Sequence, residues 1–396
     1  MTTTAINHAG FCTPLGNRAD EVLNALLAGD SRGMVSRDNL LFERPAIVGV
    51  VNTELPAIPA EFADYDCRNN ALLLCAALQI TPAVEAAKAK YGKERIAVVI
   101  GTSTSGISKG EEALEYRNRH GHFPSDYHYF QQELGGTSRF LQAWFKLSGP
   151  CYTLSTACSS SAKVFAAGKR LLDAGLCDMV IVGGVDSLCQ LTLNGFDALE
   201  SVSKGHCNPF SANRDGINIG EGAALFTLER GSGQVLLSGV GESADAHHIS
   251  APHPEGSGAI AAMEMALKQA ELTPDDIDYV NLHGTATPKN DAMESRAMHS
   301  VFAEALPPCS STKPLTGHAL GAAGALEAVF CWLLLSPLNP DGQLPPHLWD
   351  GEQDGKDPAL PLVKQGSRHS LNHLMSNSFA FGGSNASLIF SRGAPE

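Results

Sequence analysis

The order of strand-like and helix-like segments in the first half of the chain returns in the second half. In the first half, the apolar run 97–100 enters a turn of small residues, and a helical pattern follows residue 158. In the second half, the strand-like segment 278–282 enters a similar turn, and residues 322–335 have a helical pattern. A repeated order of elements is typical of a duplicated domain. The pattern therefore predicts an α/β protein with two similar halves.

The length of the chain agrees with such a duplication. With 396 residues, the chain is too long for one simple core. Apolar residues make up 43% and charged residues 18%, which is typical of a globular protein. We expect one half over residues 1–235 and the other over residues 236–396.

Charge and cysteine usage exclude several classes of protein. The net charge is −14 and basic residues do not cluster, so we expect no nucleic-acid partner. The densest apolar run, residues 328–335, is too short to span a bilayer, and residues 1–11 lack the features of a secretory signal. The ten cysteines include no CxxC pair. We therefore expect reduced thiols in a cytoplasmic enzyme and no metal site.

The stretch 152–175 places a cysteine at the start of a helix. Residues 152–156 alternate like a strand, a turn of small residues follows, and apolar residues then recur at helical spacing. Cys158 lies in the turn. The partial positive charge of a helix start lowers a thiol pKa below its usual value of about 8.5, so Cys158 is a candidate nucleophile. The alternative is a buried structural thiol.

Two histidines follow strand-like segments of the second half. His283 comes directly after the run 278–282, and His318 precedes the helical pattern at 322–335. Ligands of α/β proteins bind at strand ends. A thiolate with two imidazoles suits covalent acyl transfer, in which the cysteine takes the acyl group as a thioester. The chain has 14 histidines, so spacing alone leaves a structural or surface role open for each.

Three further positions fit such a site. Lys313 can orient the site electrostatically, although a surface lysine is the commoner case. Glu327 lies inside an apolar helical pattern and needs a buried partner. The glycines after Phe381 let the backbone approach a ligand, and the N–H groups of Phe381 and Cys158 can form an oxyanion hole, with a simple β-turn as the alternative.

With these motifs, the chain resembles the β-ketoacyl-acyl-carrier-protein synthases of the thiolase fold, the elongating type of fatty acid and polyketide pathways. The segments that carry the resemblance follow the family's order along almost the whole chain. They are STACSSSA (155–162), NPFSANRDGINIGEGA (208–223), DAHHISAPHPEG (245–256), HGTATPKND (283–291), STKPLTGHALGAAGALE (311–327) and NSFAFGGSN (377–385).

The resemblance implies a fold and a reaction. The fold would be the thiolase fold, with two similar halves in five layers, α-β-α-β-α. The reaction would be that of a 3-oxoacyl-[acyl-carrier-protein] synthase, an acyltransferase that performs a decarboxylative Claisen condensation. Cys158 would carry the acyl group. His283 and His318 would bind the malonyl thioester and stabilise the enolate, with Lys313 and Glu327 in support.

The resemblance also implies a substrate path and partners. Phe381 would act as a gate as well as an oxyanion donor, Thr285 and Thr287 would contact pantetheine, and Phe196 would line the acyl pocket. Thr104 falls where family members tune the depth of that pocket. The partners would be acyl carrier protein, malonyl carrier protein, and a second subunit that is either identical or a chain-length factor. No cofactor is implied, because the phosphopantetheine arm belongs to the carrier protein.

The second histidine separates this chain from its relatives. Initiating synthases carry Cys-His-Asn and degradative thiolases Cys-His-Cys, so His318 places the chain with the decarboxylating elongators. Departures in the N-terminal segment, near Arg68 and at Thr104 favour a secondary-metabolite enzyme, for example of the aryl-polyene type. A non-catalytic chain-length factor and a cysteine hydrolase are the alternatives.

Overall fold

Ten strands form two sets of five with the same order and directions. In the computed structural model, which describes residues 3–394, the strands run β10-β9-β11-β12-β8-β1-β7-β6-β4-β5. Counted outward from the middle of this order, where β8 and β1 meet, each set has two antiparallel pairs and then two parallel pairs. The two sets meet only through the pair Ala5 and Leu236. The predicted duplication is therefore visible strand by strand.

The strands of the first set are β1 (Thr4–Cys12), β4 (Ile96–Gly101), β5 (Cys151–Leu154), β6 (Met179–Asp186) and β7 (Gly222–Arg230). Those of the second set are β8 (Val235–Ala244), β9 (Tyr279–Asn281), β10 (Cys309–Ser310), β11 (His373–Phe379) and β12 (Ser384–Arg392). A separate small sheet pairs β2 (Met34–Arg37) with β3 (Ala46–Gly49). Where the chain divides into folding units, expected at residues 235 and 236, stays a prediction.

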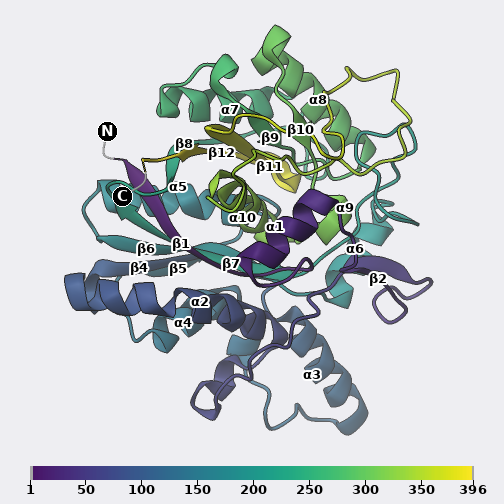
Figure 1. Ribbon diagram of the computed structural model, residues 1–396. Coiled ribbons are helices and arrows are strands. Elements are labelled where there is room, and N and C mark those ends of the chain that lie inside the picture. The colour runs from purple at the N-terminus through teal and green to yellow at the C-terminus, as the bar shows by residue number, and fades with distance from the viewer. Residues whose placement is uncertain (1–2, 395–396) are drawn as a thin grey trace.

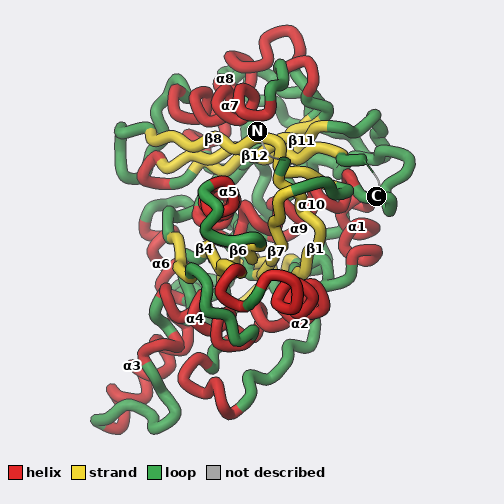
Figure 2. Tube along the Cα trace, turned by 90° about the vertical axis from the view of Figure 1, so that its left-hand side faces the viewer, coloured by secondary structure: helices red, strands yellow, loops and turns green. Residues whose placement is uncertain are grey.

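Helices fill the three other layers, as Figures 1 and 2 show. Between the two sets of strands lie α5 (Ser160–Asp173) and α10 (Ala323–Leu335). One outer layer holds α7 (Ser257–Ala270) and α8 (Pro288–Phe302), and the other holds α2 (Arg68–Tyr91) and α4 (Leu134–Trp144). The order α-β-α-β-α is the expected one. The remaining helices are α1 (Ala19–Ala28), α3 (Ile107–His120), α6 (Gln190–Ala198) and α9 (Lys313–Thr316).

The two middle helices approach each other closely near their first turns. A Cβ atom added to Gly324 of α10 would lie 2.9 Å from the backbone nitrogen of Ala162 in α5, so only glycine allows this contact. The sequence places Cys158 just before α5 and His318 just before α10. The close crossing therefore brings the candidate nucleophile and one candidate histidine to the same place.

The sequence over residues 70–90 predicts a long helical stretch that is interrupted at Thr81 and Pro82, and helix α2 differs from this prediction. The helix continues through Pro82, and the Thr81 hydroxyl donates to the Ala77 carbonyl at 3.0 Å. Pro82 deprives only the carbonyl of Leu78 of its partner, and Leu78 is exposed. Among the described residues, α2 is the one helix with the length and mean hydropathy of a membrane span. It packs on β1 and β7, and 56% of its apolar window is buried, as in a core helix.

The proline- and aspartate-rich composition of residues 337–362 predicts a surface loop, but this connection between α10 and β11 is buried in part. It contains no helix or longer strand, as expected. His347, however, is buried: its Nδ1 accepts from the Ser311 N–H at 3.1 Å, and its Nε2 lies 2.9 Å from the Pro209 carbonyl oxygen. Burial lowers the pKa of His347 to about 4, so this ring is a neutral structural bridge.

Asp186, at the end of β6, links the two halves. Its carboxylate accepts from the Thr102 hydroxyl at 2.6 Å, from the Ser103 N–H at 2.9 Å and from the Thr104 N–H at 2.8 Å. Its other oxygen accepts from the N–H of Ala322 in the second half at 3.1 Å. One buried side chain thus holds the turn after β4 against the approach to α10.

Replacing Asp186 with alanine should therefore destabilise the whole fold. The change leaves several buried donors without an acceptor, each costing about 1–3 kcal/mol, so we expect a loss of about 3–5 kcal/mol in chemical unfolding. The control is Asp178→Ala, at the other end of the strand, whose partly exposed pairs with Arg95 and Arg230 contribute about 1 kcal/mol or less. Equal losses for the two variants would contradict the linking role of Asp186.

Candidate active site

A tight turn between β5 and α5 presents the Cys158 side chain. Ala157 has a φ of 52°, in the left-handed region that alanine rarely adopts. The Ser160 hydroxyl stabilises this turn, because it donates to the Ala157 carbonyl at 2.6 Å and accepts from the Thr156 N–H at 2.8 Å. The strained residue directly before Cys158 fixes the direction of the thiol. Cys158 itself is 5% exposed.

Burial dominates the acidity of Cys158 and corrects the expectation of a lowered pKa. Desolvation raises the pKa of the thiol to about 11. The Lys313 charge and the N–H groups of Phe381 and Cys158 act in the opposite direction and favour the thiolate. The resting group is therefore a thiol that needs a nearby base to react at neutral pH.

Two imidazoles lie beside the sulfur. The rings of His283 and His318 are 5.4 Å apart between centroids and nearly perpendicular, at 86°. His283 is held by its backbone N–H, which donates to the Glu294 carboxylate at 2.8 Å, and the His318 N–H donates to the Asn218 carbonyl at 2.7 Å. Within residues 3–394, neither Nδ1 has a hydrogen-bond partner. Both rings thus keep nitrogen atoms free for a substrate.

A buried ion pair lies behind these rings. The Lys313 ammonium contacts the Glu327 carboxylate at 2.5 Å and also donates to the His283 carbonyl oxygen. Both side chains are almost fully buried. Desolvation, and then the Lys313 charge, lower the pKa of both His283 and His318 well below the usual value, so both are neutral at pH 7. Glu327 thus has the buried partner that its position in an apolar helix requires.

The three candidate groups also meet the geometric requirement for a metal site. The Cys158 sulfur and one nitrogen of each histidine lie within 4.8 Å of one another. A thiolate and two imidazoles are ligands that Zn²⁺ accepts. The ammonium of Lys313, however, acts electrostatically on all three groups and opposes a second cation. The arrangement favours covalent chemistry over metal binding.

The backbone at Phe381 completes the site around the sulfur. The N–H groups of Phe381 and Cys158 both act on the thiol and lower its pKa, so they favour negative charge at the place where a thioester oxygen would lie. Gly382 has a φ of 81°, which glycine adopts freely, and its N–H donates to the Ile249 carbonyl at 2.8 Å. These contacts fit the predicted oxyanion hole.

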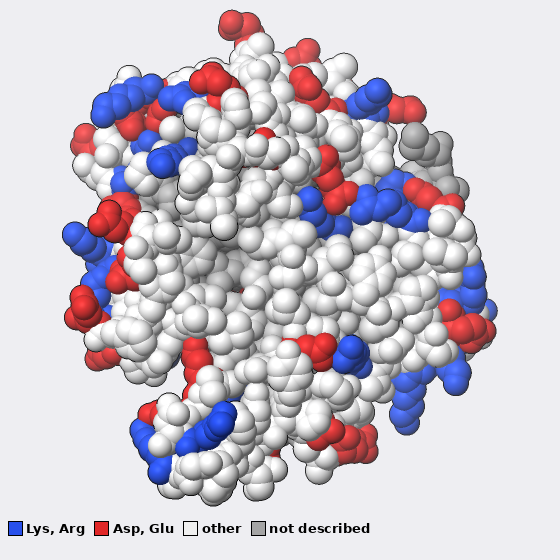
Figure 3. Space-filling view, turned by 180° about the vertical axis from the view of Figure 1, so that it is seen from behind, with Lys and Arg blue, Asp and Glu red and all other residues white. Residues whose placement is uncertain are grey.

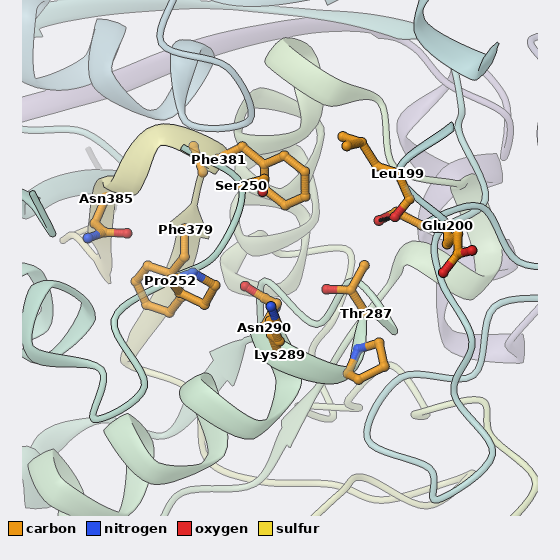
Figure 4. Close-up of a pocket in the computed structure, with 13 residues that line it drawn as sticks. Leu199, Glu200, Ser250, Pro252, Thr287, Lys289, Asn290, Phe379, Phe381 and Asn385 are labelled. Atoms are coloured by element: carbon orange, nitrogen blue, oxygen red, sulfur yellow. Dashed lines mark hydrogen bonds between the residues drawn. The ribbon is translucent and has the colours of Figure 1, made fainter. Parts of the chain in front are cut away.

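Two cavities lead to Cys158. The inner one is lined by Cys158, Phe196, Ile217, His283, Thr285, Thr287, Asn290, His318, Phe379 and Phe381. The outer one, of about 900 Å³ including its open mouth, shares Thr287, Asn290, Phe379 and Phe381 with the inner one (Figure 4). Phe196 and Phe381 lie 5.6 Å apart between ring centroids. The structure thus gathers every predicted site residue except Thr104 around one path, with Lys313 and Glu327 behind it.

Thr104 lies elsewhere. It is fully buried, lines neither cavity, and its hydroxyl donates to Asp186 at 2.9 Å. The expected influence of Thr104 on the acyl pocket stays a prediction. In the structure, Thr104 contacts Asp186, the residue that links the two halves.

Two buried acids on α8 escaped the sequence reasoning. Glu294 accepts from the N–H groups of His283 and Gly284, and Asp291 accepts from those of Phe210, Thr285 and Ala286. Both are fully buried, and desolvation raises the pKa of Glu294 to about 8 and that of Asp291 to about 6. Their spacing of three residues, which places both on one face of a helix, was the available signal.

Comparisons with known proteins agree with this geometry. Residues 46–233 match the family model for the beta-ketoacyl synthase N-terminal domain, and residues 235–348 match that for the C-terminal domain. The 3-oxoacyl-[acyl-carrier-protein] synthase 1 of Haemophilus influenzae is 31% identical over 418 aligned positions, covering 99% of both chains. The chain belongs to the beta-ketoacyl synthase family.

Other members of the beta-ketoacyl synthase family are similar over part or all of the chain. The 3-oxoacyl-[acyl-carrier-protein] synthase 2 of Rhizobium meliloti is 39% identical, over 62% of this chain and 62% of its own length. The chain thus spans about three fifths of that relative. A structure of a ketosynthase (ApeO) in complex with its chain length factor (ApeC) from Xenorhabdus doucetiae matches with a TM-score of 0.94 and 47% identity, over 99% of this chain and 98% of that one.

The raised pKa of Cys158 predicts a steep pH dependence of its alkylation. Only the thiolate reacts, so the iodoacetamide rate at the Cys158 peptide should rise about tenfold per pH unit from pH 7 to 10 without levelling off. N-acetylcysteine, the control, should level off above its pKa of about 8.5. A plateau for Cys158 near pH 8 would instead show a thiolate stabilised by the helix start.

The buried ion pair predicts a non-additive effect on stability. Glu327→Ala leaves the Lys313 charge buried without a partner and should lower the free energy of unfolding by about 3–5 kcal/mol. The double variant Lys313→Met with Glu327→Leu removes both charges and should lose less than Glu327→Ala alone. Chemical unfolding measures both. A double variant whose free energy of unfolding falls as much as that of Glu327→Ala, or more, would contradict the pairing.

Proposed function

We propose that this chain is a 3-oxoacyl-[acyl-carrier-protein] synthase that condenses an acyl thioester with malonyl carrier protein. The observation that carries the proposal is the convergence of the Cys158 sulfur and two neutral imidazoles within 4.8 Å, beside a buried lysine. Neutral imidazoles donate hydrogen bonds to a developing negative charge without a change in their own charge. Claisen condensation develops such a charge on the thioester oxygen of the malonyl group.

The first step transfers the acyl group to Cys158. The sulfur attacks the thioester carbonyl, its proton passes to a neighbouring imidazole, and the oxygen receives the N–H groups of Cys158 and Phe381. The carbon–sulfur bond to the carrier breaks, and the carrier thiol leaves with the proton. Phe196 and Ile217 give the inner cavity an apolar wall for an acyl chain.

The second step forms the new carbon–carbon bond. Malonyl carrier protein loses CO₂, and His283 and His318 donate to the oxygen of the resulting enolate. The enolate carbon attacks the acyl carbonyl on Cys158, the carbon–sulfur bond breaks, and the 3-oxoacyl chain leaves on the carrier, while the Cys158 thiolate takes up a proton from solvent. Removal of one such oxyanion donor in other enzymes costs about 3 kcal/mol in the barrier.

The partners and location follow from the same proposal. The arm that enters the two cavities belongs to acyl carrier protein, so the chain itself needs no cofactor. The similarity to a ketosynthase in complex with its chain length factor supports a heterodimer with a subunit of that kind, in a polyketide or aryl-polyene pathway. Strand β5, directly before Cys158, is the edge of the sheet and offers a pairing surface. We place the enzyme in the cytoplasm, where carrier proteins and reduced thiols occur.

The surface permits such partners. Seen from behind, the charged side chains of both signs lie mostly toward the rim, and the hollowed centre of this face carries few (Figure 3). An uncharged area of this kind is typical of protein contact regions. No stripe of a single sign, as nucleic-acid binding requires, is visible on this face.

The direct test incubates the protein with acyl carrier protein thioester and measures the mass of the Cys158 peptide. We expect an acyl adduct, and a 3-oxoacyl product after malonyl carrier protein is added. Cys158→Ala should form neither, and His318→Ala should form the adduct but condense at least 100-fold more slowly.

The same experiment separates the alternatives. The absence of any adduct on Cys158 sinks the synthase proposal. An adduct released only as free acid identifies a hydrolase. Asp178→Ala, remote from both cavities, serves as the control variant and should retain both steps.

The proposal of a heterodimer predicts a difference in condensation activity between the chain alone and the chain paired with a chain-length-factor subunit. Coexpression should yield a stable pair of unequal subunits by mass photometry, with condensation higher than for the chain alone. A stable homodimer of full activity, which takes up no second subunit, would contradict the heterodimer but not the reaction.

A further inference from the structure

Asn290 occupies the passage between the two cavities. Four residues line both cavities: Thr287, Asn290, Phe379 and Phe381. Two of them are phenylalanines, and the Thr287 hydroxyl pairs with that of Thr285 at 3.0 Å. The close-up shows the Asn290 side chain beside Thr287, directed into the space between the labelled residues (Figure 4). Any chain that reaches Cys158 from the outer cavity therefore passes this amide.

The orientation of the Asn290 amide is fixed from behind. Its Nδ2 donates to the Asp291 carboxylate at 3.3 Å. Asp291 already accepts from the Phe210, Thr285 and Ala286 N–H groups, and its pKa of about 6 leaves it mainly ionised at neutral pH. An ionised carboxylate only accepts hydrogen bonds, so the amide cannot be reversed. The Oδ1 of Asn290 is consequently turned away from Asp291 and toward the passage.

This oxygen lacks a partner in the protein. Asn290 is 6% exposed, and within residues 3–394 no hydrogen bond reaches its Oδ1. The oxygen is not fully enclosed by protein, because Asn290 lines both cavities and its Oδ1 is open to the space within them. The missing donor must come from what fills the passage, either water or substrate.

The substrate of the proposed function has one suitable donor at this depth. A pantetheine thioester has its first amide N–H two carbons from the sulfur, whereas the thioester and the acyl chain carry no donor. Asn290 shares the inner cavity with Cys158, so the group within its reach is this first amide. We propose that Asn290 is a specificity-determining residue whose Oδ1 accepts a hydrogen bond from the pantetheine amide nearest the thioester. This inference rests on the proposed function and adds a residue and an atom to it.

Two small thioesters that differ in one group test the assignment. The first is an S-acyl N-acetylcysteamine, which carries the amide N–H. The second is the S-acyl thioester of 2-acetoxyethanethiol, in which an oxygen replaces that N–H. The second-order rate of Cys158 acylation by each is measured by mass spectrometry of the whole protein and of the Cys158 peptide.

The wild-type protein should prefer the amide by up to about tenfold, the value of one hydrogen bond. Asn290→Ala should slow acylation by the amide thioester to about the rate of the ester and so abolish the preference. Asn290→Ser, a second variant, should also lose most of the preference, because its hydroxyl is too short to reach the same place. Asn213→Ala removes an exposed amide that bonds Asp350 outside both cavities, and should keep the full preference.

Two readouts separate this role from a structural one. Methyl methanethiosulfonate, which has no N–H group, should modify Cys158 at the same rate in the wild type and in Asn290→Ala. A preference for the amide that survives in both Asn290 variants would overturn the inference and leave the proposed function intact. A wild-type protein whose Cys158 is acylated at the same rate by both thioesters would also overturn the inference and leave the proposed function intact. The absence of acylation by either would overturn the proposed function, and this inference with it.

Discussion

The buried ammonium of Lys313 is the interaction on which the site depends. A cation in the protein interior is tolerated only with an anionic partner and further acceptors, and Glu327 and the His283 carbonyl oxygen supply them. The charge in turn acts on Cys158, where it favours the thiolate, and on both histidines, where it disfavours the imidazolium. Burial is the largest influence on the pKa of all three groups, and the ion pair adds to it at the two imidazoles and opposes it at Cys158.

The duplicated architecture brings these groups together. Cys158 precedes α5 in the first half, and His318 precedes α10 in the second, so both lie at the starts of the two middle-layer helices. The crossing at Gly324 holds the starts of these helices side by side, and the Asp186 carboxylate ties the approach to α10 to the turn after β4. His283 comes from the end of β9, where Glu294 fixes its backbone. The reaction centre is therefore a contact between the halves, which neither half contains alone.

Much of this could be predicted because local patterns carried it. The repetition of strand–turn–helix segments predicted the two halves. The turns within these segments contain Cys158, His283 and His318, which were therefore predicted as the candidate site. The pKa of Cys158 was predicted in the wrong direction, because a helix start is visible in a sequence whereas the depth of burial is not. Pro82 was expected to interrupt its helix, but the helix continues. The carbonyl that loses its hydrogen-bond partner belongs to the exposed Leu78, so the loss costs little.

Other parts had no local signal. Asp186 and Glu294 act on backbone N–H groups that are distant in sequence or hidden in a turn, and no motif marks a carboxylate as an acceptor of such groups. The position of Asn290 between two cavities depends on the whole fold, because residues distant in sequence, such as Asn290 and Phe381, line both cavities. Contacts of this kind come from tertiary structure rather than from spacing along the chain.

The central claim is that burial and the Lys313 charge together keep both imidazoles neutral at the pH of the reaction. Nitrogen-15 chemical shifts of the histidine rings, followed from pH 5 to pH 8 and assigned with His283→Gln and His318→Gln, measure this directly. We predict that both rings remain neutral at neutral pH, because burial and then the Lys313 charge lower their pKa well below the usual value. Protonation of either ring with a pKa near 6.5 would contradict the account.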